Sequence, residues 1–274
     1  MARWTLNDIP WDRFDPSKVE PDLLAVIKTA ALVEANAADY VVYLRNVFRE
    51  DADFVAAAET WGVEEEQHGA ALGRWAELAD PGFSFEKALA DFRAGYSLDL
   101  ETTTSIRGSR AGELIARQVV ETGTSSFYSA IRDATDEPVL KAVAGRIASD
   151  EFFHYRLFAE HFRRYQAKTR LSTWARLKIA FGRMQEAEDE ELGYAFFAAN
   201  VLQRDRAADF KAVNYGREYQ RRALQLYRRP HIDNAVRMVL RAADLKSNGW
   251  LYKLASRVLW RVISAKSASM ARAA

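Results

Sequence analysis

The stretch WGVEEEQHG, residues 61–69, places three consecutive glutamates beside His68. Glu65 and His68 are three residues apart, so on a helix their side chains share a face and can reach one ion. The stretch DEFFH repeats this spacing with Glu151 and His154. One Glu-x-x-His pair is weak evidence, because two fixed residues recur by chance. Two pairs on two long predicted helices indicate a metal site built between facing helices of a bundle.

Each pair has a lone glutamate upstream at a matching distance. Glu34 precedes Glu65 by 31 residues, and Glu121 precedes Glu151 by 30 residues. Residues equidistant from the turn of an antiparallel hairpin face each other, and the two midpoints fall in predicted turns, at residues 49–50 and 136. At about 1.5 Å per residue, all the glutamates lie roughly 23 Å from their turns. The predicted metal ligands are Glu34, Glu65, His68, Glu121, Glu151 and His154, with one glutamate from each hairpin bridging two ions.

The rest of the chain favours an all-helical fold. The 274 residues include only 13 glycines and 6 prolines, and apolar residues recur at spacings of three and four. We expect one continuous first helix from Pro21 to about Phe48. Three further long helices and a short connector follow, separated by breakers at 49–53, 80–82 and 135–138. A basic helical remainder follows residue 167, with breaks near Gly193, Pro230 and Asn248-Gly249. The predicted division is a lead-in (1–19), a four-helix bundle (20–167) and a C-terminal extension (168–274).

Composition excludes several kinds of site. The chain has no cysteine, so disulfides, thiolate metal ligands and cysteine nucleophiles are absent. No signal peptide or membrane-spanning run is visible, and we expect a cytoplasmic protein. Residues 1–160 carry 16 Lys+Arg against 28 Asp+Glu, a net −12, whereas residues 161–274 carry 23 against 10, a net +13. Such a division of charge can indicate an acidic partner, nucleic acid or a membrane, but no nucleic-acid-binding motif accompanies the basic half. A cluster of cation-binding carboxylates would also make the first half acidic.

Four glutamates and two histidines on four helices resemble the ferritin-like di-iron and di-manganese carboxylate proteins. Within that superfamily the motifs are most similar to those of the soluble acyl-carrier-protein desaturases. The stretch WGVEEEQHG shares the Trp, the paired Glu, the His and the Gly of that family's second-helix motif, and IASDEFFHY resembles its fourth-helix motif. ETGT, with Glu121 and Thr124, resembles its third-helix Glu-x-x-Thr. The similarity covers residues 20 to 167, with Phe152-Phe153 standing in place of Lys-Arg.

The resemblance implies a ferritin-like four-helix bundle with added C-terminal helices. It also implies two iron ions, manganese being an alternative, that react with O2 and oxidise a C–H bond of an acyl chain. Thr124 would assist with oxygen and protons. Without cysteines or a dinucleotide-binding motif, electrons would come from a separate ferredoxin or reductase. An acyl carrier protein is a possible partner, and a homodimer is usual in such families.

Other residues admit an ordinary explanation as well as a functional one. Thr124 could instead bond to a carbonyl of its own helix. We expect Trp61, Tyr40 and Tyr128 to be packing residues and His161 to be satisfied or exposed. We also expect three outer acids to be helix-surface charges rather than groups that support the ligands: Glu64, Glu66 and Asp150.

The C-terminal stretch WLYKLASRVLWRVISAK predicts a basic amphipathic helix, with Lys253, Arg257 and Arg261 at four-residue spacing. Packing on the bundle is the favoured role. Docking to an acidic carrier protein and docking to an anionic membrane surface are the alternatives.

Four classes of function remain open. The favoured one is an O2-dependent di-iron oxidase or desaturase acting on a hydrophobic, carrier-bound acyl substrate. The alternatives are a ferritin-like ferroxidase or iron-handling protein, a di-iron hydroxylase or N-oxygenase, and a helical scaffold without metal. Ile147 occupies the position where related N-oxygenases carry an extra histidine, which disfavours that reaction.

Overall fold

The computed structural model describes residues 3–186 and 190–272, and these residues form helices and no strand. Short 3-10 turns occur in the N-terminal segment at Leu6–Asp8, Trp11–Arg13 and Pro16–Lys18. The α-helices are α1 (Pro21–Ala35), α2 (Ala37–Val47), α3 (Ala52–Ala79), α4 (Phe85–Gly95), α5 (Arg110–Ala134), α6 (Pro138–Thr169), α7 (Thr173–Gln185), α8 (Glu190–Asn200), α9 (Tyr215–Ala223), α10 (Arg229–Ala242) and α11 (Trp250–Arg272). The prediction of an all-helical chain is confirmed.

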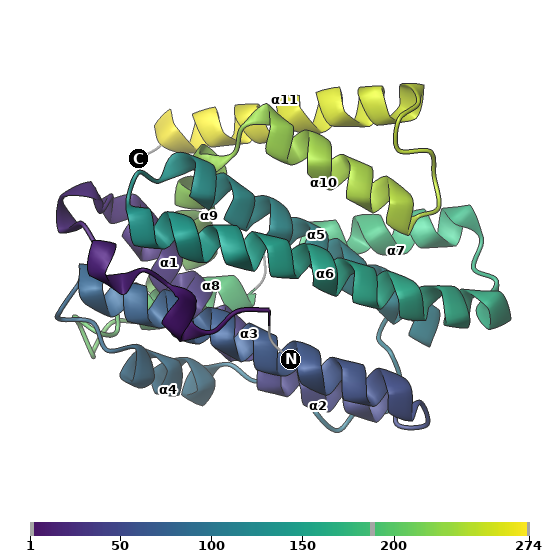
Figure 1. Ribbon diagram of the computed structural model, residues 1–274, viewed down its shortest axis with the longest axis horizontal. Coiled ribbons are helices and arrows are strands. Elements are labelled where there is room, and N and C mark those ends of the chain that lie inside the picture. Colours follow the sequence, from purple (N-terminus) through teal and green to yellow (C-terminus); the bar gives the residue numbers. More distant parts are fainter. Residues whose placement is uncertain (1–2, 187–189, 273–274) are drawn as a thin grey trace.

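Two helical hairpins form the centre of the molecule, α1–α2 with α3 and α5 with α6 (Figure 1). Local capping fixes where α3 and α6 begin. The Asp51 carboxylate accepts the backbone N–H of Phe54 at the start of α3. At the start of α6, Pro138 occupies the first turn and Glu137 accepts two backbone N–H groups. The predicted turns therefore lie where the sequence placed them, and α3 packs against α6 to join the hairpins.

The first helix is not continuous, which corrects the sequence prediction. It is interrupted at Asn36, two residues after Glu34, where α1 ends and α2 begins. The Asn36 N–H bonds to the carbonyl of Val33 instead of the one a full turn back. The carbonyl of Ala35 accepts Arg93 Nη2 of α4 at 2.8 Å. A side chain from a neighbouring helix thus replaces a backbone hydrogen bond of the helix. The spacing of apolar residues in the sequence does not indicate this replacement.

Small residues let the first hairpin close tightly near this break. A Cβ on Gly69 would lie 2.6 Å from the backbone nitrogen of Ala35. The glycine therefore allows α3 to approach α1 directly beside Glu34 and Glu65. Large buried side chains, including Trp75, Ile27 and Leu72, fill the space toward one end of the hairpin. Phe48, Phe54 and Phe158 fill the other end.

The remaining helices cover the two hairpins. Residue Gly193 does not break a helix, contrary to expectation. It lies within α8, where its Cβ position would be 3.2 Å from the backbone of Gly216. The glycine here permits close packing of α8 rather than a turn. The other expected breaks are found, since Pro230 lies in the first turn of α10 and Asn248-Gly249 precedes α11.

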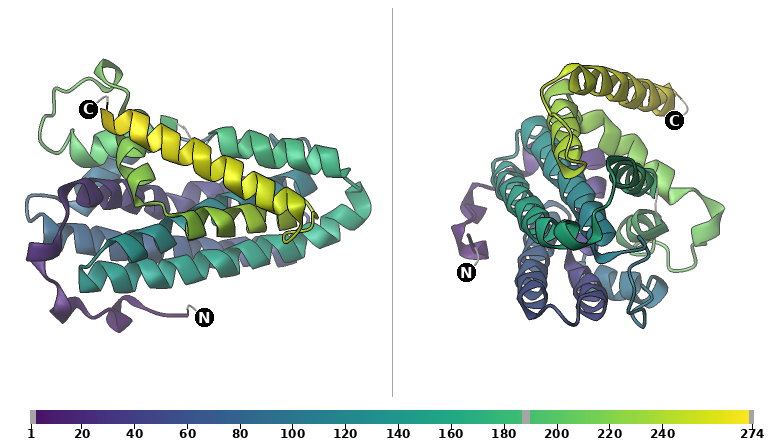
Figure 2. Two further views of the ribbon diagram at one scale, coloured as in Figure 1. Left: turned by 90° about the horizontal axis from the view of Figure 1, so that it is seen from above. Right: turned by 90° about the vertical axis from the view of Figure 1, so that its right-hand side faces the viewer.

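The outermost helix is α11, which lies along α10 on one edge of the molecule (Figure 2). Its inward side packs Leu251, Leu259 and Ile263 against a cluster centred on Ile232 and Val236. Among the described residues, no helix combines the length and apolar character needed to cross a bilayer.

The N-terminal segment lies against the outside of α3 and α6 (Figure 2). Arg146 donates to the carbonyl of Asp8 at 2.7 Å, and the backbone N–H of Asp15 donates to Glu137 at 3.2 Å. The Arg74 guanidinium stacks over the Trp11 ring. We call residues 3–19 the N-terminal strap, because these contacts hold an irregular segment across two helices.

Candidate metal centre

Six buried side chains from four helices meet between the two hairpins. Glu34 comes from α1, Glu65 and His68 from α3, Glu121 from α5, and Glu151 and His154 from α6. They form two groups whose candidate ligand atoms lie within 4.8 Å of one another. One group contains Glu34, Glu65, His68 and Glu151, and the other contains Glu65, Glu121, Glu151 and His154. All six predicted ligands are therefore brought together, and Glu65 and Glu151 belong to both groups.

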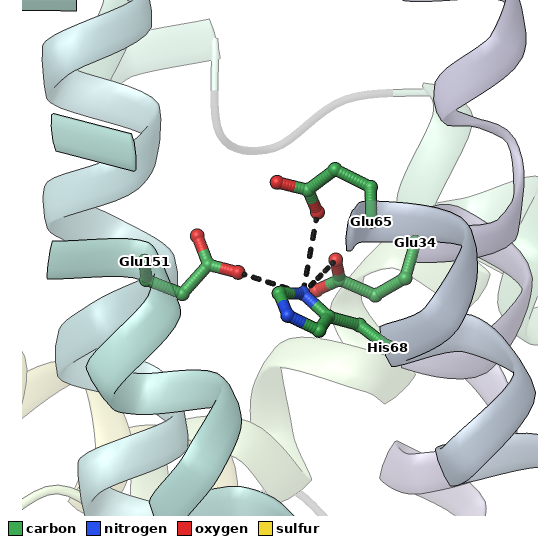
Figure 3. Close-up of side chains that lie close together, drawn as sticks. All are labelled: Glu34, Glu65, His68 and Glu151. Carbon is green, nitrogen blue, oxygen red and sulfur yellow. Dashed lines mark ion pairs between the residues drawn. The ribbon is translucent and has the colours of Figure 1, made fainter. Parts of the chain in front are cut away.

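In the first group, three carboxylates surround one nitrogen of His68 (Figure 3). The Nδ1 atom lies 3.3 Å from Glu151 Oε1, 3.6 Å from Glu65 Oε2 and 3.7 Å from Glu34 Oε2. These separations leave room for a cation bound at the usual 2.0–2.2 Å by each atom.

The second group repeats the arrangement around His154. Its Nδ1 atom lies 3.0 Å from Glu65 Oε1, 3.7 Å from Glu121 Oε2 and 3.9 Å from Glu151 Oε2. The two oxygens of Glu65 therefore face different histidines, and so do the two oxygens of Glu151. A carboxylate in this position can bridge two ions.

Several polar atoms in the centre have no hydrogen-bond partner within the described residues. They are His68 Nδ1, His154 Nδ1, Glu121 Oε1 and Glu151 Oε1. Buried polar atoms without partners are rare because each costs about 1–3 kcal/mol. All four belong to the six candidate ligands, so the donor set fits a cation that these atoms would coordinate.

The pKa values in the centre reflect crowded acids. Burial, followed by the charge of Glu65, raises the pKa of Glu34 well above its ordinary value. Burial and the charge of Glu151 do the same to the pKa of Glu121. Burial alone would lower the pKa of His68, but the surrounding carboxylates, Asp150 first and then Glu151, raise it well above 6.5. Without a cation, the centre therefore retains protons to offset its negative charge.

Two further acids orient the histidines from the opposite side. Asp150 Oδ2 lies 3.1 Å from His68 Nε2, and Glu64 Oε2 lies 2.8 Å from His154 Nε2. With each Nδ1 facing the carboxylates, each Nε2–H is left to donate to the outer acid. Carboxylates that hold ligating histidines in this way fix the tautomer and make the imidazole a better ligand.

These contacts correct the expectation that the outer acids are surface charges. Glu64 and Asp150 are only 7% and 2% exposed. Of the three acids that we expected to face solvent, only Glu66 does so. The bonds also cross the molecule, because Glu64 of α3 supports His154 of α6 while Asp150 of α6 supports His68 of α3. Sequence spacing did not reveal this pairing, since each acid directly precedes a ligand and so points away from it on its own helix.

The N-terminal strap closes this outer side. Arg3 donates to Asp150 Oδ1 at 2.6 Å and to Glu64 Oε2 at 2.9 Å. Trp4 donates from Nε1 to Asp150 Oδ2 at 2.7 Å, and its ring stacks parallel to His68 with centroids 6.1 Å apart. Sequence reasoning assigned no role to these residues. The irregular lead-in carries no periodic pattern or motif that could have linked it to residues about 150 positions later.

The remaining candidates divide into neighbours of the centre and packing residues. Thr124 donates to Glu151 Oε2 at 2.5 Å, while two carbonyls of α5 lie 3.3 Å from the same hydroxyl. Both suggested roles of Thr124 are thus compatible with its position. Tyr128 donates to Glu34 and so contacts a candidate ligand, which packing alone did not predict. Tyr40 donates to Glu191 instead. Trp61 packs on Phe158, as expected for a core aromatic.

The donor set limits the cation. Carboxylate oxygens and imidazole nitrogens suit iron, manganese and zinc, and the excess of carboxylate over nitrogen favours iron or manganese. Four ionised glutamates would balance two divalent ions. No protein-family model and no curated protein matches this chain. The assignment of a function therefore depends on the geometry of the centre and on the motifs that form it.

Proposed function

We propose that this protein is a ferritin-like two-metal carboxylate enzyme that uses O2 to oxidise a hydrophobic acyl substrate. The observation that carries the proposal is the sharing of Glu65 and Glu151 between two groups of ligand atoms. A bridging carboxylate from each hairpin is the arrangement that a coupled pair of ions needs. A solvated charge cluster would not bury four glutamates around two imidazoles whose Nδ1 atoms have no hydrogen-bond partner.

In this proposal the protein side chains hold the metal ions and orient the histidine ligands. Glu34 and Glu121 would each hold one ion, while Asp150 and Glu64 would keep the two imidazoles directed at the ions. Two iron ions bound there would supply the chemistry that reduces O2 and oxidises an unactivated C–H bond. Thr124 keeps a hydroxyl proton at Glu151 Oε2, where it can serve a proton transfer.

The acyl substrate rests on the resemblance of the motifs to those of the acyl-carrier-protein desaturases. A cavity of about 1190 Å³ lies alongside α6, and its lining includes Phe152, Phe153, Arg156 and Arg163. None of the six candidate ligands lines it, so it is not the apolar channel to the metals that this function requires. That channel remains a prediction.

Metal analysis of the purified protein tests the proposal. We expect about two iron or manganese ions per chain, and loss of most of this metal in Glu65→Ala and in Glu151→Ala. Glu66→Ala is the matched control, because it removes an adjacent but exposed carboxylate. Fewer than one ion per chain, with no difference among the three variants, would overturn the metal centre.

A second measurement separates the oxidase from an iron-handling protein. The reduced iron-loaded protein is exposed to O2 with an acyl-carrier-protein substrate, a ferredoxin and its reductase. Oxidised acyl product, detected by mass spectrometry, supports the proposal. Catalytic oxidation of added ferrous ion without acyl oxidation would instead assign a ferroxidase.

A further inference from the structure

A row of exposed apolar side chains runs obliquely along α11. Trp250, Leu254, Val258 and Val262 follow one another at four-residue spacing. They are 75%, 48%, 50% and 55% exposed, respectively. The row spans thirteen residues, 250–262, or about 18 Å of helix. Contiguous exposed apolar side chains of this kind mark a surface that meets a partner.

Three cations lie beside this row. Lys253, Arg257 and Arg261 are exposed, and none has an ion pair or side-chain hydrogen bond to a described residue. The last acidic residue of the chain is Asp244, so α11 contains no carboxylate at all. Its positive charge is therefore not balanced within the helix, in contrast to the paired arginines of α9.

The opposite side of α11 is already occupied. Leu251, Leu259 and Ile263 pack on the α10 cluster, and the Tyr252 hydroxyl accepts Arg237 Nη2 at 3.0 Å. Ser256 donates to Asp233 of α10. The helix is thus anchored to the molecule in a fixed orientation, and Figure 2 shows it at the outermost edge, with no other described helix over its outward side.

We propose that α11 docks flat on an anionic lipid surface, with its apolar row at the boundary between headgroups and acyl chains and its cations among the phosphates. A basic amphipathic helix binds such a surface through both parts of its face at once. The indole of Trp250 suits the same boundary, because it is apolar with one polar N–H. This docking needs no metal and no membrane-spanning segment, so it stands independently of the proposed function.

Two other occupants fit the face less well. A second copy of the chain related by a two-fold axis would bring α11 against α11, and the like charges of both helices would repel. An acidic protein would match the charge of the three cations. It would also have to present an apolar groove for the apolar row, directly beside its acidic groups. A lipid surface supplies both kinds of contact without a shaped partner.

Vesicle flotation of the 274-residue chain tests this inference. We expect binding to phosphatidylcholine vesicles rich in phosphatidylglycerol, little binding to pure phosphatidylcholine, and weakening at high salt. The double variant Arg257→Glu/Arg261→Glu should lower the partition coefficient about tenfold or more. Leu254→Ser/Val258→Ser should lower it about tenfold with all charges intact.

The matched control is Arg49→Glu/Lys178→Glu, which reverses two exposed cations elsewhere and should retain vesicle binding. Circular dichroism checks that every variant is folded. Absence of binding to anionic vesicles would overturn the inference, and so would an equal loss of binding in the control. A dimer in solution that Leu254→Ser/Val258→Ser dissociates, without vesicle binding, would assign the face to a second copy instead.

Discussion

Glu64 and Glu66 are two identical side chains, two positions apart, with opposite surroundings. Glu64 accepts from His154, whereas Glu66 faces solvent. Because an outer carboxylate orients a ligating imidazole, Glu64→Gln should weaken metal binding about 10- to 100-fold while the fold is retained. Chelator competition with ferrous ion measures the affinity. Glu66→Gln is the control, and an equal effect in both variants would contradict the role of Glu64.

Thr124 allows a similar comparison on the other hairpin. Thr124→Val keeps the shape of the side chain but removes the hydroxyl that donates to Glu151. We expect unchanged metal content and a roughly 10- to 100-fold slower reaction of the reduced protein with O2, as for loss of a hydrogen bond to a charged group. Stopped-flow absorption measures the rate. Thr124→Ser should restore the rate. A normal rate in Thr124→Val would show that the hydroxyl has no role at Glu151 and serves only in its hydrogen bonds to α5.

At the scale of the helices, the approach of α3 to α1 depends on Gly69. A methyl group there would meet backbone as well as side-chain atoms of Ala35, and backbone cannot rotate away. Gly69→Ala should therefore destabilise the protein by about 1–3 kcal/mol. Gly182→Ala in α7 is the control, because nothing lies within 4 Å of its Cβ position. Urea unfolding compares the two, and equal stability would show that the hairpin can relax.

The helices and the six candidate ligands were predictable because both follow from short-range regularities. Apolar spacing predicts helices, and equal distances from a turn bring Glu34 level with Glu65 and Glu121 level with Glu151. The break at Asn36 was not predictable, since it depends on Arg93 reaching a carbonyl from another helix. Gly193 was misinterpreted because a glycine that ends a helix and one that allows close packing look alike in sequence. Arg3 and Trp4 were missed because no local pattern connects a strap to the helices it crosses.

For the molecule as a whole, the charge of the centre should make stability depend on pH and on metal. The pKa of both histidines is raised above 6.5, so their stabilising contribution is complete below pH 6.5 and is lost as pH rises through the raised values. Glu34 and Glu121, whose pKa values are also raised, act in the same direction. Metal-free protein should therefore become less stable as pH increases above 6.5, by at most about 1.4 kcal/mol per pH unit for each histidine.

Thermal unfolding of chelator-treated protein across this range measures the effect. Bound metal should flatten the dependence, because the cation replaces the protons that neutralise the acids. His161→Ala is the control, since His161 lies outside the centre and its pKa is lowered by burial. Stability of the metal-free protein that stays constant or increases above pH 6.5 would contradict this account.

The N-terminal strap also has a consequence for how the protein is made. Arg3 and Trp4 leave the ribosome long before their partner Asp150, from which they are separated by 147 and 146 residues. The hairpin of α1 to α3 can form during synthesis, but it then holds only Glu34, Glu65 and His68, with no bridging oxygen from α6. The strap can seal the outer acids only after α6 has been synthesised and packed. Contacts this distant in sequence form late in folding, so the order of synthesis delays closure of the centre until both halves of the ligand set are present.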